Sequence, residues 1–199
     1  LFRDLDIVII NPNSDKHMIP AGKLREPLKN FRRADLLVIN NKFEKNPVNE
    51  NRKNMPQVIC NYVFEGIRGI DNTVLPVEDI KSATVYCGIG EPDSFKLLLN
   101  ELNIKIDEFI VFPDHHYFTN TELENLMNSF SKNGSSHILT TQKDYVRLKN
   151  SELVLKAKSN NTYKNLLFNF PLYFTKIKMQ INSNGEYLFK EIDNLLKSE

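Results

Sequence analysis

The chain has little of several features that mark particular protein classes. It contains two cysteines, Cys60 and Cys87, which make no metal-ligand pattern, and we expect two buried free thiols in a reducing compartment. No apolar run reaches the roughly 18 residues that a membrane-spanning helix needs, and we expect no signal peptide. The net charge is only +1, which argues against a strongly basic nucleic-acid-binding domain. There are 7 glycines, and no glycine-rich phosphate loop occurs in the sequence.

The overall composition is typical of a folded domain. Of the 199 residues, 41% are hydrophobic, enough to bury a sizeable core, and global disorder is excluded. A chain of this length forms one ordinary domain or two small ones.

Short apolar runs and helical patterns alternate along the chain. Buried strands are predicted at residues 6–10, 34–40, 84–87, 109–112 and 137–141, and one or two more at residues 166–179, broken at Pro171. Helices are predicted from Pro27, from Pro92, from the capping box Thr119-x-x-Glu122 and after Gly185. This alternation predicts an α/β fold with mostly parallel sheets and flanking helices.

A polar stretch at residues 41–56 separates two such regions. Residues 56–67 alternate apolar and polar side chains, which predicts a half-exposed strand acting as a hinge or an edge. We therefore predict a first lobe at residues 1–55, a β hinge at 56–82, a second α/β lobe at 83–185 and a C-terminal helix at 186–199.

Polar clusters follow three of the predicted strands, where open α/β sheets bind their ligands. The first is Asp114-His115-His116, in which a carboxylate beside imidazoles could orient a tautomer, bind a metal or move a proton. A histidine packed under a turn is the simpler alternative.

The second cluster, Arg25-Glu26, precedes Pro27 at the start of a predicted helix. Such a position suits an anionic ligand, although Glu26 could also serve the helix dipole alone. The third cluster offers the hydroxyls of Thr140 and Thr141, the cation of Lys143 and the carboxylate of Asp144. Its simpler interpretation is a turn at the strand end with a surface Lys–Asp pair.

At these clusters the chain resembles the tetraacyldisaccharide 4′-kinase family of lipid A biosynthesis. The matching stretches, in order, are RDLDIV (3–8), IPAGKLREP (19–27), RAD (33–35), GIGEP (88–92) with Phe95, FPDHH (112–116) and TTQKD (140–144). They span roughly residues 1–148. Gln142 stands where the family usually has Glu.

The resemblance implies a P-loop kinase that uses ATP and Mg²⁺ to phosphorylate the 4′-hydroxyl of a glucosamine-disaccharide lipid. It implies that this reaction takes place at the cytoplasmic face of the bacterial inner membrane and that the protein has no nucleic-acid partner. Residues 1–55 would then end a nucleotide-binding lobe, followed by a smaller Rossmann-like lobe.

The resemblance also suggests roles for single residues. His115 matches a histidine that the family uses beside its catalytic aspartate, with His116 as the adjacent candidate. Asp114 and Glu26 join it as catalytic candidates, and Glu26 is the one candidate metal ligand. The candidates for binding substrate or phosphate are Arg25, His116, Lys143, Thr140 and Thr141.

The missing phosphate loop is the main departure from the family. Together with the first residue, Leu1, it leads us to expect a C-terminal piece of a longer enzyme that binds ATP weakly or not at all by itself. Two alternatives stay open: a metal-dependent phosphoesterase of the Asp-His-His type, and a non-catalytic α/β binding module.

Overall fold

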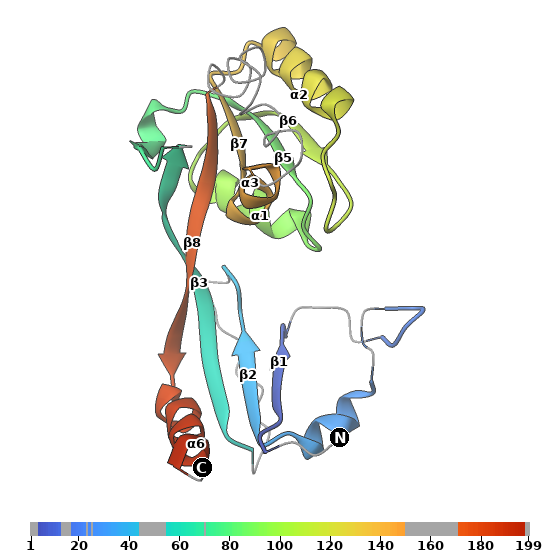
Figure 1. Ribbon diagram of the computed structural model, residues 1–199, viewed down its shortest axis with the longest axis vertical. Coiled ribbons are helices and arrows are strands. Elements are labelled where there is room, and N and C mark those ends of the chain that lie inside the picture. Colours follow the sequence, from blue (N-terminus) through green and yellow to red (C-terminus); the bar gives the residue numbers. More distant parts are fainter. Residues whose placement is uncertain are drawn as a thin grey trace. The chain divides into compact units, whose positions relative to one another are not determined.

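The computed structural model describes residues 4–12, 17–22, 24, 26–43, 55–69, 71–149 and 171–197. Contacts between residues group the chain into two compact units, Leu1–Val63 with Lys178–Glu199, and Phe64–Ile177. The strands β3 (Gln57–Gly69) and β8 (Leu172–Ser183) contribute residues to both units. The strand order is β1-β2-β3-β8-β7-β5-β6, with β4 paired to β3 (Figure 1). The predicted α/β class with a mostly parallel sheet is confirmed.

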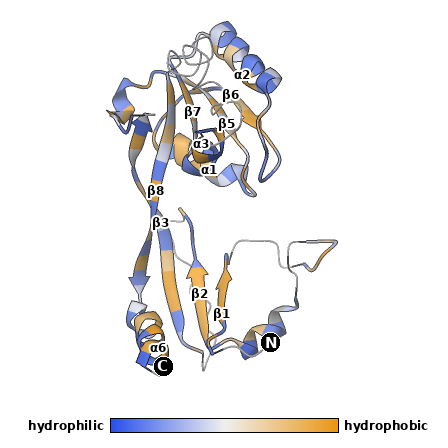
Figure 2. Cartoon of the chain, viewed as in Figure 1, coloured by the Kyte–Doolittle hydropathy of each residue, from blue (hydrophilic) through white to orange (hydrophobic). Residues whose placement is uncertain are grey.

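The first unit is built on apolar, β-branched strands. β1 (Ile7–Ile10), β2 (Leu36–Asn40) and the start of β3 are parallel neighbours, with Val38 opposite Val58. All five residues of β2 are buried, and Figure 2 shows β1 and β2 as largely hydrophobic. From the C-terminal part of the chain, Ile181 of β8 and Leu188 of α6 (Gly185–Lys197) pack against the core of this unit.

Of two expectations for the first unit, one is confirmed and one needs correction. The short helix predicted from Pro27 is confirmed as the 3₁₀ helix η1 (Leu28–Arg33), and no side chain caps its start. The predicted hinge or edge strand is β3, which is not an edge because β2 and β8 flank it in the strand order. Its far end pairs antiparallel with β4 (Val74–Leu75), after which η2 (Val77–Asp79) leads toward the next strand.

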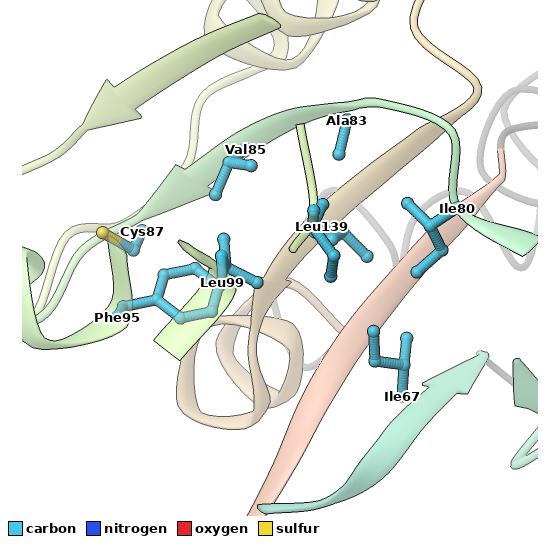
Figure 3. Close-up of a cluster of buried hydrophobic side chains, with 9 residues drawn as sticks. Ile67, Ile80, Ala83, Val85, Cys87, Phe95, Leu99 and Leu139 are labelled. Carbon is cyan, nitrogen blue, oxygen red and sulfur yellow. The ribbon is translucent and has the colours of Figure 1, made fainter. Parts of the chain in front are cut away.

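The second unit is a parallel sheet with a helix layer on each face. Its strands are β5 (Ala83–Cys87), β6 (Ile106–Val111), β7 (His137–Thr141) and the start of β8, in the order β8-β7-β5-β6. On one face, Val85 and Leu139 pack with Phe95 and Leu99 of α1 (Pro92–Glu101), as Figure 3 shows. On the other, Tyr86 packs with residues of α2 (Asn120–Asn133) and α3 (Gln142–Lys149). Alternate residues of β5 therefore serve opposite faces.

The local signals that start these helices are those the sequence predicts. Pro92 occupies the first turn of α1. Thr119 and Glu122 form the predicted capping box of α2, and Gly134 ends that helix in the left-handed conformation, with φ 63°. Helix α3 was not predicted, because the sequence there was interpreted as a turn.

The structure also bears on the expectations for the cysteines, the last strand and membrane-spanning helices. Cys60 and Cys87 are buried free thiols, as predicted. β8 begins at Leu172, just after Pro171, and residues 166–170 of the predicted strand lie outside the described residues. Within the described part of the chain, no helix is both long and apolar enough to cross a membrane. The domain boundaries at 55, 82 and 185 stay predictions.

Candidate active site

The candidate site lies where three parallel strands of the second unit end. Gly88 follows β5, the loop with Asp114 and His115 follows β6, and α3 follows β7 directly. Because β6 and β7 lie on opposite sides of β5, the strand order reverses between β5 and β7. In open α/β sheets such a switch point, at the carboxyl ends of the strands, is where ligands bind.

A buried carboxylate anchors the site. The Asp144 side chain is fully buried, and its Oδ2 accepts hydrogen bonds from the Gly88 backbone N–H at 3.0 Å and the Thr141 hydroxyl at 2.7 Å. The Asp144 N–H also lies 3.2 Å from the Thr141 oxygen. This reciprocal pair starts α3 and ties it to the end of β5.

Arg147, one turn further along α3, neutralises this carboxylate. Its Nη1 lies 3.1 Å from Asp144 Oδ1 and donates to the Gly88 carbonyl oxygen at 2.7 Å. Its Nη2 donates to His115 Nδ1 at 3.1 Å and lies 3.8 Å from Asp114 Oδ1. A single guanidinium thus joins the buried end of the site to its exposed end.

The absence of a side chain at Gly88 allows this close approach. A Cβ at residue 88 would lie 3.1 Å from the Pro113 carbonyl oxygen and 3.4 Å from Asp144 Oδ1. The loops after β5 and β6 therefore meet through the backbone of Gly88.

Asp114 and Lys143 form the exposed end of the site. Lys143 Nζ donates to Asp114 Oδ1 at 3.1 Å. This hydrogen bond, followed by the Lys143 and His115 charges and the His115 N–H, holds the pKa of Asp114 below its ordinary value. The charge pair predicted within residues 140–144 is therefore made differently, since Lys143 pairs with Asp114 and Asp144 pairs with Arg147.

His115 is exposed and held in an unusual backbone conformation. Its φ is 62°, in the left-handed region that costs a residue with a Cβ about 1–2 kcal/mol. Its N–H donates to Asp114 Oδ1 at 2.9 Å, while its Nε2 lies 3.7 Å from Asp114 Oδ2. The side chain is 75% exposed, so Nε2 is accessible to a ligand.

His116 turns the other way. Its Nε2 lies 3.0 Å from both carboxylate oxygens of Glu122, and its ring stacks on Phe112 with centroids 4.9 Å apart. Hydrogen bonds from His116 first, and then from Thr119, lower the pKa of Glu122. His116 therefore supports the start of α2, and a role in binding substrate stays a prediction.

The two threonine candidates also have structural positions. Thr140 is fully buried beside Tyr86, whose pKa is raised by burial. Thr141 caps α3 through Asp144. Neither residue is as exposed as His115 or Lys143, and their predicted binding roles stay predictions.

The Arg25-Glu26 cluster belongs to the first unit. Arg25 lies outside the described residues. Glu26 is exposed and pairs with Arg33 and with the Asn30 amide, which lies 3.0 Å away. No side chain makes a capping hydrogen bond at the start of η1, and the alternative that Glu26 serves the helix dipole stays a prediction.

Sequence reasoning missed Arg147, Gly88 and Glu122 as site residues. Arg147 could have been found from its spacing, because it lies three residues after Asp144 and such pairs meet on one helix face. The link from Arg147 to His115 could not, because it joins residues 32 positions apart.

The described residues do not by themselves fit the cofactors that the resemblance implies. They contain no group of three or more His, Cys, Asp or Glu side chains able to hold a metal ion. The cations Lys143 and Arg147 are paired with Asp114 and Asp144. A triphosphate cradle of backbone N–H groups would need the glycine-rich loop that the sequence lacks.

The parallel sheet with a helix layer on each face places the second unit in the doubly wound α/β class, in which ligands bind at the switch point. The family described as Tetraacyldisaccharide-1-P 4'-kinase matches residues 1–196, well beyond the roughly 148 residues of the resemblance noted above. The chain belongs to this family.

Curated relatives named tetraacyldisaccharide 4'-kinase support this assignment. The Chlorobium limicola protein is 30% identical over 98% of this chain and 56% of its own length. The Aquifex aeolicus protein is 32% identical over 77% of this chain and 46% of its own length. A crystal structure of LpxK from Aquifex aeolicus in complex with ATP matches with a TM-score of 0.61 and 26% identity, over 97% of this chain and 53% of that one. The chain thus spans about half the length of these relatives. Membership of this family favours the kinase resemblance over the phosphoesterase and the binding module.

Proposed function

We propose that this chain is part of a kinase that transfers a phosphoryl group from ATP to the 4′-hydroxyl of a tetraacyl glucosamine-disaccharide 1-phosphate. Its family membership over residues 1–196 supports the reaction class. The observation that carries the proposal is the cluster itself: the family-like stretches at residues 88–92, 112–116 and 140–144 converge on one switch point.

In this proposal His115 assists removal of the proton from the acceptor hydroxyl. Phosphoryl transfer to a hydroxyl depends on positioning the acceptor and removing its proton. The exposed His115 Nε2 can hold the carboxylate that receives this proton. Asp114 and Lys143 hold the loop that carries His115, and Arg147 holds its ring from the other side.

ATP and Mg²⁺ would be held mainly by residues outside these 199, since the described residues do not fit them. When bound, they supply the phosphoryl group and neutralise its charge. We expect the lipid acceptor to be presented at the cytoplasmic face of the inner membrane. We also expect the 199 residues alone to bind ATP weakly or not at all, and micromolar MgATP affinity by calorimetry would contradict that expectation.

The experiment is a transfer assay with the complete protein that contains this chain. Purified protein is incubated with γ-³²P-labelled ATP, Mg²⁺ and tetraacyl disaccharide 1-phosphate, and the lipid is analysed by chromatography and mass spectrometry. We expect a labelled 1,4′-bisphosphate. Absence of label in the lipid, with the protein folded, would overturn the proposal. Metal-dependent cleavage of a phosphodiester would support the phosphoesterase instead.

A further inference from the structure

The contacts of Arg147 set it apart from the other charged residues of the site. Its guanidinium bonds to Gly88 and Asp144, which are both buried, and extends outward to His115, which is exposed. Only 18% of the Arg147 side chain is exposed. The buried partners therefore fix the guanidinium, and the guanidinium in turn contacts the exposed imidazole of His115.

In the contact between Arg147 and His115, only Arg147 can be the hydrogen-bond donor. A guanidinium has N–H donors and no acceptor, and it stays charged at all relevant pH values. Its Nη2, 3.1 Å from His115 Nδ1, can only donate, so Nδ1 must present its lone pair. In the neutral imidazole the single ring proton is then on Nε2.

The geometry points to Arg147 as the positioning residue that fixes His115 as the Nε2–H tautomer. The kinetic part of this inference rests on the proposed function. With Nδ1 engaged, Nε2 is a donor, able to hold a carboxylate or an oxygen of the reacting groups. With the opposite tautomer, Nε2 would be an acceptor, and that interaction would be lost.

The other charged groups near His115, namely Asp114, Lys143 and Asp144, do not determine its tautomer. Asp114 Oδ2 is 3.7 Å from His115 Nε2, too far for a hydrogen bond. Lys143 donates to Asp114, and Asp144 pairs with Arg147 itself. Among the described residues, Arg147 is therefore the group that directly bonds a ring nitrogen of His115.

Lysine could not replace arginine in this role. The guanidinium uses Nη1 for Gly88 and Asp144, and Nη2 for His115. A lysine ammonium is a single nitrogen on a flexible stem and cannot span both sets of partners. Arg147→Lys keeps the charge beside Asp144 and so separates loss of the fold from loss of the contact to His115.

The test is nitrogen NMR of the complete protein labelled with ¹⁵N-histidine, with His115 assigned by the loss of its signals in His115→Gln. The variants are Arg147→Met and Arg147→Lys, and Lys149→Met is the control, which removes an exposed cation from the same helix. Thermal unfolding reports whether each variant folds, and steady-state kinetics give kcat and KM.

We expect wild type and Lys149→Met to show an unprotonated Nδ1 and a protonated Nε2 on neutral His115. Arg147→Met and Arg147→Lys should show averaged signals of two tautomers and a kcat roughly tenfold to a hundredfold lower, at little changed KM. A protonated Nδ1 in wild type, or unchanged tautomer signals in both variants, would overturn the inference whatever the activity. Altered tautomers with unchanged kcat would instead overturn the catalytic role of His115, and with it that part of the proposed function.

Discussion

Arg147 and Asp144, one turn apart on α3, hold the same glycine from both sides: Arg147 donates to the Gly88 carbonyl oxygen, and Asp144 accepts from the Gly88 N–H. The end of β5 is therefore fixed to the helix that follows β7. Since these strands flank the switch point, this relationship gives the candidate site a rigid base.

Replacing Asp144 by Asn should destabilise the protein strongly. The change removes the nearer carboxylate from the largely buried Arg147 and leaves it, among the described carboxylates, only Asp114 at 3.8 Å, and breaking a buried pair costs about 3–5 kcal/mol. Because Arg147 keeps some exposure, we expect about 2–4 kcal/mol, measured by urea unfolding. Glu124→Gln, on an exposed position of α2, should change stability by less than about 0.5 kcal/mol. Equal stability of both variants would show that the Asp144 pair does not hold the fold.

Gly88→Ala should also lower stability, by about 1–3 kcal/mol, because the new methyl group meets the Pro113 backbone carbonyl at 3.1 Å. Gly90→Ala is the matched control. Its added Cβ would meet Asp114 at 3.4 Å, an ordinary contact. Thermal unfolding of both variants measures the difference, and a Gly88→Ala protein as stable as Gly90→Ala would contradict the close approach.

Stability at acid pH should depend on Asp107, which lies near the start of β6, at the end of the second unit's sheet opposite the candidate site. Hydrogen bonds from Ser82, Ser135 and Lys105 lower the pKa of Asp107 to about 2. Since this is below the unfolded value of about 3.9, its stabilising contribution is complete above pH ~4 and is lost as the pH falls toward ~2. Asp107→Asn should therefore be less stable than wild type at pH 7, with a gap that narrows between about pH 4 and pH 2. A gap that is constant over this range in urea unfolding would refute this assignment.

The backbone of His115 gives a fourth prediction. At φ 62°, glycine is tolerated without cost and alanine is not. His115→Gly should be more stable than His115→Ala by about 1 kcal/mol, although both remove the imidazole. Equal melting temperatures would mean that the loop relaxes and that no strain is held at this residue.

The sequence predicted the features that depend on neighbouring residues. The apolar runs at residues 34–40 and 137–141 are strands, and Thr119 with Glu122 caps α2, because β-branched content and cap spacing act locally. The placement of Asp114, His115 and Lys143 together at strand ends also followed from the α/β alternation.

What could not be predicted depends on residues far apart in the chain. α3 was missed because its first turn is polar, although Tyr145 and Leu148 are buried on one face. The two histidines of residues 115–116 could not be told apart, because Glu122 and Arg147 determine which way each ring turns. The neighbours of β3 in the sheet could not be predicted either, because alternating apolar and polar side chains indicate a strand but not the strands that pair with it.

The central claim is that His115 serves phosphoryl transfer, and the kcat of His115→Ala in the complete protein tests it most directly. The assay uses saturating ATP and tetraacyl disaccharide 1-phosphate, with His17→Ala, an exposed histidine of the first unit, as the control. We predict that kcat falls by roughly 10²–10⁴ while KM changes little and the control keeps wild-type activity. A folded His115→Ala protein with a kcat within about twofold of wild type would contradict the claim.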